Sequence, residues 1–319
     1  MRLLSSVAVL ALLTAVVPAA HAQDVKLSIS TGGTGGVWYP MGGAMANVLT
    51  KHMKSTAATA EVTGGSVDNV RLLGSNKTEL AFSMVDTAWE GANALGKFKD
   101  KVPMRTIAVV HPLVMHVVSV EGRGIDKMAD LKGKRISTGS PGSGTEVMAL
   151  RILEAYGIHP DKDILRQRLS VAEAANAVKD RKLDAFMHAA GVPLPAVTDL
   201  AATPGTKPKL IDHADATEAM KKKYGPIYAS TSIPAKSYPG QDKENQTASV
   251  WGVLYVHEKM PEQVAYDIVR TLFVRQQDIV LGHKEAANMT LANQQIGASP
   301  IAWHPGALRY FKEKGVTPK

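Results

Sequence analysis

The chain has 319 residues, of which 45% are hydrophobic and 21% charged, and it contains no cysteine. This composition is typical of a globular protein, and at roughly 150 residues per domain the length suggests about two domains. The missing thiols exclude disulfide frameworks, thiolate metal sites, iron–sulfur clusters and cysteine nucleophiles. The formal net charge of +8 comes from 37 Lys+Arg against 29 Asp+Glu residues.

The N-terminus has the pattern of a secretory signal peptide. Arg2 precedes an apolar run over residues 3–17, and a small-residue A-x-A site ends at Ala22. The run is shorter than the roughly 20 apolar residues that a membrane-spanning helix needs. We therefore predict cleavage after Ala22 and export of the mature chain to the periplasm. That compartment favours binding proteins, hydrolases and envelope factors over enzymes that depend on ATP or nicotinamide.

Strand-like and helix-like segments alternate along the remaining sequence. The apolar pattern predicts strands over 25–30, 80–85, 106–120 with a break at Pro112, 135–138, 184–188 and 250–256. Helical spacing follows most of these strands, and the longest predicted helix covers 261–283. This alternation predicts an α/β fold with largely parallel sheets, in which ligands bind beyond the carboxyl ends of the strands.

Three loops rich in glycine and hydroxyl groups stand between a predicted strand and a predicted helix. They cover residues 31–36, 64–66 and 139–145. Glycines allow close backbone approach, and the free amides at a helix start attract anions. Together the loops predict a site for an anion or another polar ligand, although each loop alone also fits a tight turn. Ser143 and Glu146 match a capping box for the helix that follows, and Ser170 and Glu173 match a second capping box before the helix predicted to run to about Arg181.

Motifs for common enzyme chemistry are absent from the sequence. The loop 139–145 lacks the lysine of a Walker A motif, and Trp38 stands where a dinucleotide-binding loop needs its third glycine. There is neither a G-x-S-x-G elbow nor an H-E-x-x-H motif. The lysine run 221–223 has no interleaved aromatics, so we predict no nucleic-acid binding. The sequence also predicts no metal and no cofactor.

Three side chains have competing interpretations. We interpret His111 and His116 as surface or satisfied core imidazoles rather than metal ligands. Asp86, at a strand-to-helix boundary, is interpreted as a helix cap rather than a ligand contact.

Five segments of the mature chain resemble the TAXI proteins, which are the extracytoplasmic solute receptors of one class of TRAP transporter. Residues 34–44 resemble the family signature GTGG-x-YYP-x-GGA. The other four segments, in order, are 65–73, 139–146, 232–240 and 304–307. The chain departs from the family pattern at Trp38, at Lys236 and over 82–87.

The resemblance implies a two-lobed periplasmic-binding-protein fold of type II, the Venus-flytrap fold, with each lobe a mixed, mostly parallel sheet flanked by helices. We place the first lobe at 23–112 plus 230–319 and the second at 113–229. The implied function is a monomeric receptor, not an enzyme, that captures a small carboxylate or amino acid such as glutamate, glutamine or 2-oxoglutarate. Its lobes would close by hinge bending and dock on the membrane permease of an ion-driven TRAP importer.

Carried over by motif, the resemblance implies ligand-binding residues on both lobes. They are Thr34, Gly35, Gly36, Tyr39, Ser66, Val67, Asn69, Ser140, Gly142, Ser143, Gly144, Thr145 and Gly191. Whether Trp38, Asp86 or His116 contacts the ligand stays open at this point. Two alternatives also stay open, namely a receptor of the same fold that serves an ABC importer or a sensor kinase, and a periplasmic enzyme.

Overall fold

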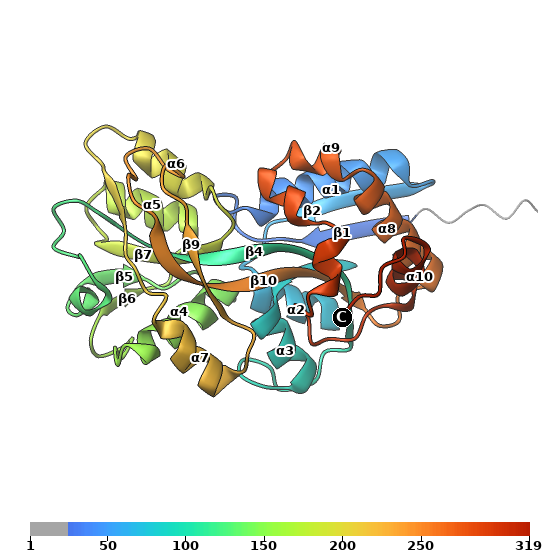
Figure 1. Ribbon diagram of the computed structural model, residues 1–319, viewed down its shortest axis with the longest axis horizontal. Coiled ribbons are helices and arrows are strands. Elements are labelled where there is room, and N and C mark those ends of the chain that lie inside the picture. Colours follow the sequence, from blue (N-terminus) through green and yellow to red (C-terminus); the bar gives the residue numbers. More distant parts are fainter. Residues whose placement is uncertain (1–24) are drawn as a thin grey trace, which may run out of the picture.

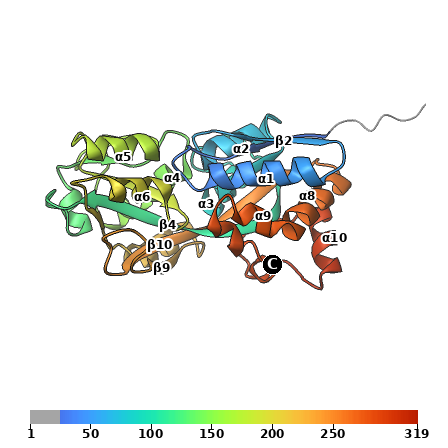
Figure 2. The same ribbon diagram turned by 90° about the horizontal axis from the view of Figure 1, so that it is seen from above.

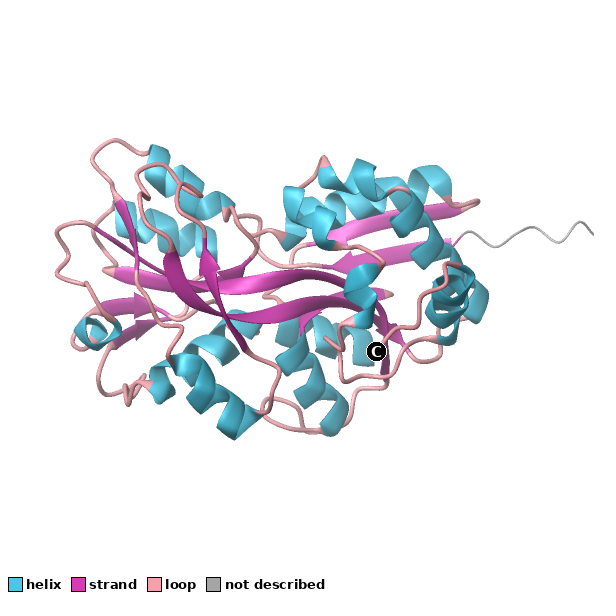
Figure 3. Cartoon of the chain, viewed as in Figure 1, coloured by secondary structure: helices cyan, strands magenta, loops and turns pink. Residues whose placement is uncertain are grey.

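The computed structural model describes residues 25–319, which form an α/β protein (Figures 1 and 3). The predicted signal peptide, residues 1–22, lies outside the described residues. None of the helices described over 25–319 has the length and apolar character needed to cross a membrane. The strands are β1 (Val25–Ser30), β2 (Thr56–Glu61), β3 (Leu80–Met84), β4 (Met104–Val120), β5 (Arg135–Ser137), β6 (Leu165–Gln167), β7 (Ala185–Ala190), β8 (Pro208–Leu210), β9 (Ala229–Ile233) and β10 (Asn245–His257).

The helices follow most of these strands, as the alternating pattern predicts. They are α1 (Trp38–His52), α2 (Ser66–Gly74), α3 (Val85–Asn93), α4 (Gly144–Ala155), α5 (Val171–Lys179), α6 (Pro195–Ala202), α7 (Ala216–Tyr224), α8 (Glu262–Val274), α9 (Gln276–Val280) and α10 (Pro305–Glu313), with 3-10 turns η1 (Met128–Leu131), η2 (Lys284–Asn288) and η3 (Ala292–Gln295).

One curled sheet holds the molecule together. Its strand order is β2-β1-β3-β10-β4-β7-β5-β6, with β8 on β4 and β9 on β10. Strands β1, β2 and β3 pair in parallel, and so do β5, β6 and β7. The long antiparallel strands β4 and β10 join these two parallel blocks (Figure 2). We call the block with β1–β3 and its helices the first lobe, and the block with β5–β7 and its helices the second lobe.

Strands β4 and β10 run through both lobes. β10 pairs with β9 over residues 245–249 and with β3 over residues 252–256. β4 pairs with β10 up to Val114 and with β7 from Val114 onward. The chain therefore passes between the lobes inside continuous strands, and the predicted lobe limits at 112/113 and 229/230 stay a prediction.

The predicted strand break at Pro112 is wrong. Pro112 pairs with Trp251 inside β4, which continues from Met104 to Val120. Proline removes a ladder donor and is tolerated where a strand lacks a neighbour on one side. Pairing with β7 begins only at Val114, so at Pro112 the strand has β10 as its neighbour and the missing N–H disturbs little.

The predicted single helix over 261–283 is also wrong, because the structure divides it into α8 and α9. The chain leaves the helical region at Arg275, where φ is −106° and ψ is 21°. The side-chain amide of Gln276 then donates to the carbonyls of Ala286 and Ala287 at 2.9 and 3.0 Å. This contact holds α9 against η2. A straight continuation of α8 would carry residues 276–280 away from η2.

Two histidines of β4 are fully buried and hydrogen-bonded, which confirms their interpretation as core imidazoles. His111 Nε2 accepts from the indole N–H of Trp38 at 3.0 Å, and its Nδ1 contacts the Pro112 carbonyl at 2.8 Å. His116 Nε2 lies 2.7 Å from the Tyr238 hydroxyl. Burial lowers the pKa of His111 to about 4 and that of His116 to about 3.

These lowered pKa values predict that the protein loses stability as the pH falls. An unfolded histidine titrates near pH 6.5, so below that pH the unfolded chain binds more protons than the folded chain. Each of the two imidazoles should cost about 2 kcal/mol of stability at pH 5 relative to pH 7. In urea unfolding, a His116→Gln variant should lose less stability than the parent between pH 7 and pH 5. Equal losses in the two proteins would contradict this assignment.

A buried ion cluster joins α3 of the first lobe to α4 of the second. Arg151 donates to Asp86 at 3.2 Å and to the Tyr228 hydroxyl at 2.5 Å, and it also pairs with Glu90. The Tyr228 hydroxyl donates to Asp86 at 2.6 Å. Burial acts to lower the pKa of Arg151, but Tyr228, Asp86 and Glu90 outweigh it and the net pKa is raised. Arg151 therefore stays charged.

The interpretation of Asp86 as a helix cap is wrong. Met84 occupies the N-cap position of α3, while Asp86 lies within the first turn and is fully buried. Its carboxylate is directed to Arg151 of the other lobe, a contact between residues 65 positions apart. Sequence spacing gives no sign of such a pairing.

Replacing Arg151 by methionine should destabilise the protein strongly. The change removes the guanidinium group and leaves the buried carboxylate of Asp86 without its charged partner, which costs about 3 kcal/mol or more. As a matched control, Lys221→Met removes an exposed pair with Glu218 and should change stability by less than about 1 kcal/mol. Chemical denaturation measures the free energy of unfolding of both variants. Equal losses of stability would contradict the assignment of Arg151 and Asp86 as a buried ion pair.

Candidate functional site

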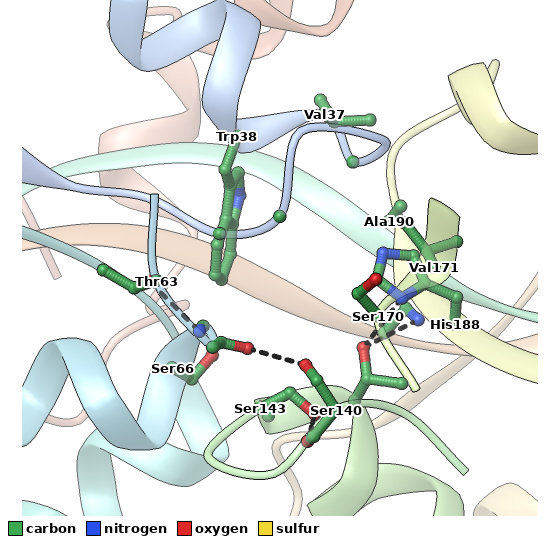
Figure 4. Close-up of a pocket in the computed structure, with 18 of the residues that line it drawn as sticks. Val37, Trp38, Thr63, Ser66, Ser140, Ser143, Ser170, Val171, His188 and Ala190 are labelled. Carbon is green, nitrogen blue, oxygen red and sulfur yellow. Dashed lines mark hydrogen bonds between the residues drawn. The ribbon is translucent and has the colours of Figure 1, made fainter. Parts of the chain in front are cut away.

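A cavity of about 230 Å³ lies between the two lobes. Its walls are the segments that leave the carboxyl ends of β1, β2 and β3 in the first lobe and of β5, β6 and β7 in the second (Figure 4). The lining residues are Gly32, Gly33, Thr34, Gly36, Val37, Trp38, Val62, Thr63, Gly64, Gly65, Ser66, Met84, Leu113, Ser140, Ser143, Gly144, Thr145, Ser170, Val171, His188, Ala189 and Ala190. Parallel strands place all their carboxyl ends on one side, so the loops of each lobe meet here.

Four helices begin at this cavity, two from each lobe. The N-cap residues of α1, α2, α4 and α5 are Val37, Gly65, Ser143 and Ser170, and all four line it. Gly65 has φ of 116°, a conformation that residues with a side chain rarely adopt. Each helix start carries unpaired N–H groups and a partial positive charge. The cavity is therefore electropositive without any cationic side chain.

The sequence explains how two of these helices start. Ser170 and Glu173 form the complete capping box of α5. Ser143 Oγ accepts from the backbone N–H of Glu146 at 3.0 Å, as predicted, but the reciprocal half of this capping box is absent. The Glu146 carboxylate instead accepts from Arg166 at 2.5 Å and Arg168 at 2.9 Å, because both arginines reach it from β6 and the loop after it.

The lobes touch each other at the rim of the cavity. Ser140 Oγ donates to the Gly64 carbonyl at 3.1 Å, and the Asp68 N–H donates to the Gly142 carbonyl at 3.1 Å. A Cβ added to Gly144 would lie 2.5 Å from Ser66 Oγ. The absence of a side chain at residue 144 thus allows α4 to approach α2 closely.

His188 is the one titratable side chain among the described residues that line the cavity. Burial lowers its pKa to about 4, so the imidazole is neutral at pH 7. Its Nδ1 lies 3.4 Å from Thr145 Oγ1, and Thr145 Oγ1 also accepts from the Ala189 N–H at 3.2 Å. The described lining consequently carries no formal charge at neutral pH.

Trp38 forms an apolar wall opposite the serines (Figure 4). Its ring stacks on Phe82, with centroids 5.5 Å apart, and its N–H is already donated to His111. The indole therefore presents hydrocarbon surface to the cavity. In Figure 4 the hydroxyl side chains of Ser66, Ser140 and Ser143 lie on the other side of the space from Trp38.

The structure brings about half of the predicted ligand-binding residues together at the cavity. Those that line the cavity are Thr34, Gly36, Ser66, Ser140, Ser143, Gly144 and Thr145. Those that do not are Gly35, Tyr39, Val67, Asn69, Gly142 and Gly191. Trp38, whose role the sequence left open, lines the cavity, whereas Asp86 and His116 do not.

The residues outside the lining have other contacts. The Asn69 amide donates to the carbonyls of Thr31 and Phe82 at 2.7 and 2.8 Å and thereby fixes α2 to the first lobe. Val67 and Gly142 line a neighbouring groove. A Cβ at Gly191 would lie 2.4 Å from Glu285 Cγ, so this glycine allows η2 to pack on the second lobe.

Sequence reasoning missed several lining residues, among them Met84, Leu113, Ser170, Val171 and His188. A signal existed for some of them. Ser170 begins a recognised capping box, and His188 ends a recognised strand, so both lie at the carboxyl edge of a predicted parallel sheet. Leu113 had no such signal, because it reaches the cavity from the middle of β4.

A Gly144→Ala substitution should push the lobes apart. The new methyl group would stand 2.5 Å from Ser66 Oγ and 2.7 Å from Met84 Sδ. We expect a larger radius of gyration in solution scattering than for the parent. Gly43→Ala is the matched control on α1, since nothing lies within 4 Å of its Cβ position. An unchanged radius for Gly144→Ala would show that this contact does not limit closure.

Comparison with known proteins gives a family and a fold. A model of the NMT1-like family matches residues 29–315. A putative L-cystine ABC transporter from Listeria monocytogenes has a similar structure, with a TM-score of 0.51, 13% identity, and coverage of 83% of this chain and 95% of that chain. A protein from Bordetella bronchiseptica RB50 has a TM-score of 0.52, 17% identity, and coverage of 90% and 89%.

A protein from Xanthomonas citri bound to ATP has a TM-score of 0.50 and 10% identity, with 90% of this chain and 94% of that chain covered. At these identities the likeness shows a common fold. With the two lobes described above, it confirms the predicted type II periplasmic-binding-protein fold.

Proposed function

The chain belongs to the NMT1-like family, and on that basis we propose that it is a periplasmic solute receptor, exported with cleavage after Ala22, that captures a small carboxylate or amino acid. The observation that carries the proposal is the meeting of four helix starts, two from each lobe, at one cavity. Unpaired amides at helix starts bind anions without a cationic side chain. A cavity of about 230 Å³ suits a small metabolite.

In this proposal, capture works through closure of the lobes. A solute held by α2 and by α4 makes its full set of contacts only when the two lobes are together. Binding therefore favours the closed arrangement by the difference in the solute's affinity for the closed and open forms. The ion cluster around Arg151 and the contact between Ser140 and Gly64 add direct contacts between the lobes.

The arrangement favours binding over catalysis. Thr145 and His188 come nearest to a nucleophile and base, with 3.4 Å between Oγ1 and Nδ1. A base with a pKa of about 4 accepts protons poorly at pH 7. Among the described lining residues there is no carboxylate to orient that imidazole or raise its basicity. A receptor without enzymatic activity is the function that fits this site best.

Two kinds of importer are candidate partners. The motifs over 34–44 and 139–146 resemble TAXI receptors, which favours an ion-driven TRAP permease. The likeness to a putative L-cystine ABC transporter favours an ABC importer as the second candidate. Neighbouring genes distinguish them, since a large fused permease would accompany the first and an ATPase the second. We retain the TRAP importer as the first candidate because the motifs cover both sides of the cavity.

The purified protein should retain or bind a small acid or amino acid. Native mass spectrometry of the fresh protein should reveal a bound solute, and the same solute should raise the unfolding temperature. A ligand at 100 times its Kd stabilises the folded state by about 2.7 kcal/mol. No retained mass, together with no thermal shift from any small acid or amino acid, would refute the proposed function.

A further inference from the structure

Three backbone carbonyls at the cavity already accept hydrogen bonds. The carbonyl of Gly33 accepts from the Gly36 N–H at 3.0 Å. The Gly64 carbonyl accepts from Ser140 Oγ at 3.1 Å, and the Ser140 carbonyl accepts from Ser143 Oγ at 2.7 Å. No Asp or Glu occurs among the described residues that line the space. A bound ammonium group would find no carboxylate here, and each of these three carbonyls already has a donor.

The hydrogen-bond donors, in contrast, are free. Within residues 25–319 the backbone N–H groups of Ser66, Gly144 and Thr145 have no acceptor. The Ser66 hydroxyl accepts from the Met84 N–H at 3.1 Å, and its own hydrogen has no acceptor within the same range, although Ser66 is only 1% exposed. This buried hydroxyl lines the cavity between the starts of α2 and α4.

His188 can add a further donor. Its Nδ1 lies 3.4 Å from Thr145 Oγ1, and Nε2 has no hydrogen-bond partner among the described residues. In the tautomer that carries the ring hydrogen on Nε2, this N–H is free to donate to an anion. The free backbone N–H groups at the starts of α2 and α4 therefore complement an anion, while the described lining offers an ammonium group no carboxylate.

The remaining walls are apolar. Trp38 contributes a ring whose N–H is already used, and Val37 and Leu113 add further apolar lining. A second charged group on the solute would lie against hydrocarbon there and lose its hydration without compensation. An apolar group would instead displace water from these walls.

We infer that the solute is a carboxylate with an apolar body and no ammonium group, with its carboxylate at the starts of α2 and α4 and its body against Trp38. This inference rests on the proposed function and narrows its ligand class. It separates an organic acid from the amino acid with the same carbon skeleton, because the amino acid carries an ammonium group for which the described lining has no carboxylate partner.

Titration calorimetry at pH 7 with matched compounds tests the inference, using protein dialysed free of any co-purified solute. 4-Methylpentanoate and leucine form one pair, and 2-oxoglutarate and glutamate form a more polar pair. We expect 4-methylpentanoate to bind about tenfold or more tighter than leucine, the effect of one unpaired charged group. We also expect it to bind tighter than 2-oxoglutarate.

The possible failures are distinguishable. If leucine or glutamate binds as tightly as its deaminated partner, the inference is overturned while the receptor function stands. If 2-oxoglutarate binds more tightly than 4-methylpentanoate, the inference that the solute has an apolar body is overturned. If no acid or amino acid binds in calorimetry or in native mass spectrometry, the proposed function itself fails and the inference fails with it.

A pair of variants at the two ends of α2 tests where the carboxylate of the solute binds. Ser66→Ala removes the free hydroxyl at the start of α2 and should weaken 4-methylpentanoate binding about tenfold. Ser75→Ala, at the exposed far end of α2, should leave the affinity unchanged. Circular dichroism and unfolding temperature verify that both variants fold. Equal affinities of the parent and a folded Ser66→Ala variant for 4-methylpentanoate would contradict the placement of the carboxylate at the start of α2.

Discussion

The meeting of helix starts at an uncharged cavity is the constraint on which the rest of the structure depends. A parallel strand and the helix after it place their connecting loop at the carboxyl end of the strand, so each lobe presents its loops on one side. β4 and β10 hold the two lobes so that these sides face each other. Partial charges from α1, α2, α4 and α5 then add within one small volume.

Close approach of the loops requires small residues. Gly144 allows α4 to contact Ser66, and Gly64 and Ser140 join the two loops by a hydrogen bond. Lysine or arginine at these positions would bring charge to the site but would also occupy the space that the solute needs. Backbone amides and hydroxyls therefore recognise the polar group of the solute. These groups are short, and the helices hold them in place.

Charged groups are placed away from the cavity. Arg151, Asp86, Glu90 and Tyr228 form a buried cluster between α3 and α4, and Glu146 pairs with arginines that reach it from β6 and the loop after it. Each cluster satisfies its own members, which is what a buried charge requires. The field at the cavity consequently comes mainly from helix starts, while the ion cluster between α3 and α4 ties the lobes together.

The amino-acid sequence by itself determined the local elements and the character of the loops. Alternation predicts β1 and β3, glycine and serine predict the starts of α2 and α4, and a capping box predicts α5, because these features depend on neighbouring residues. Only the tertiary structure decided that Asp86 pairs with Arg151, that Leu113 reaches the cavity, and that β4 continues through Pro112. Those outcomes depend on contacts between distant segments, and no spacing within one segment encodes which segment will lie opposite.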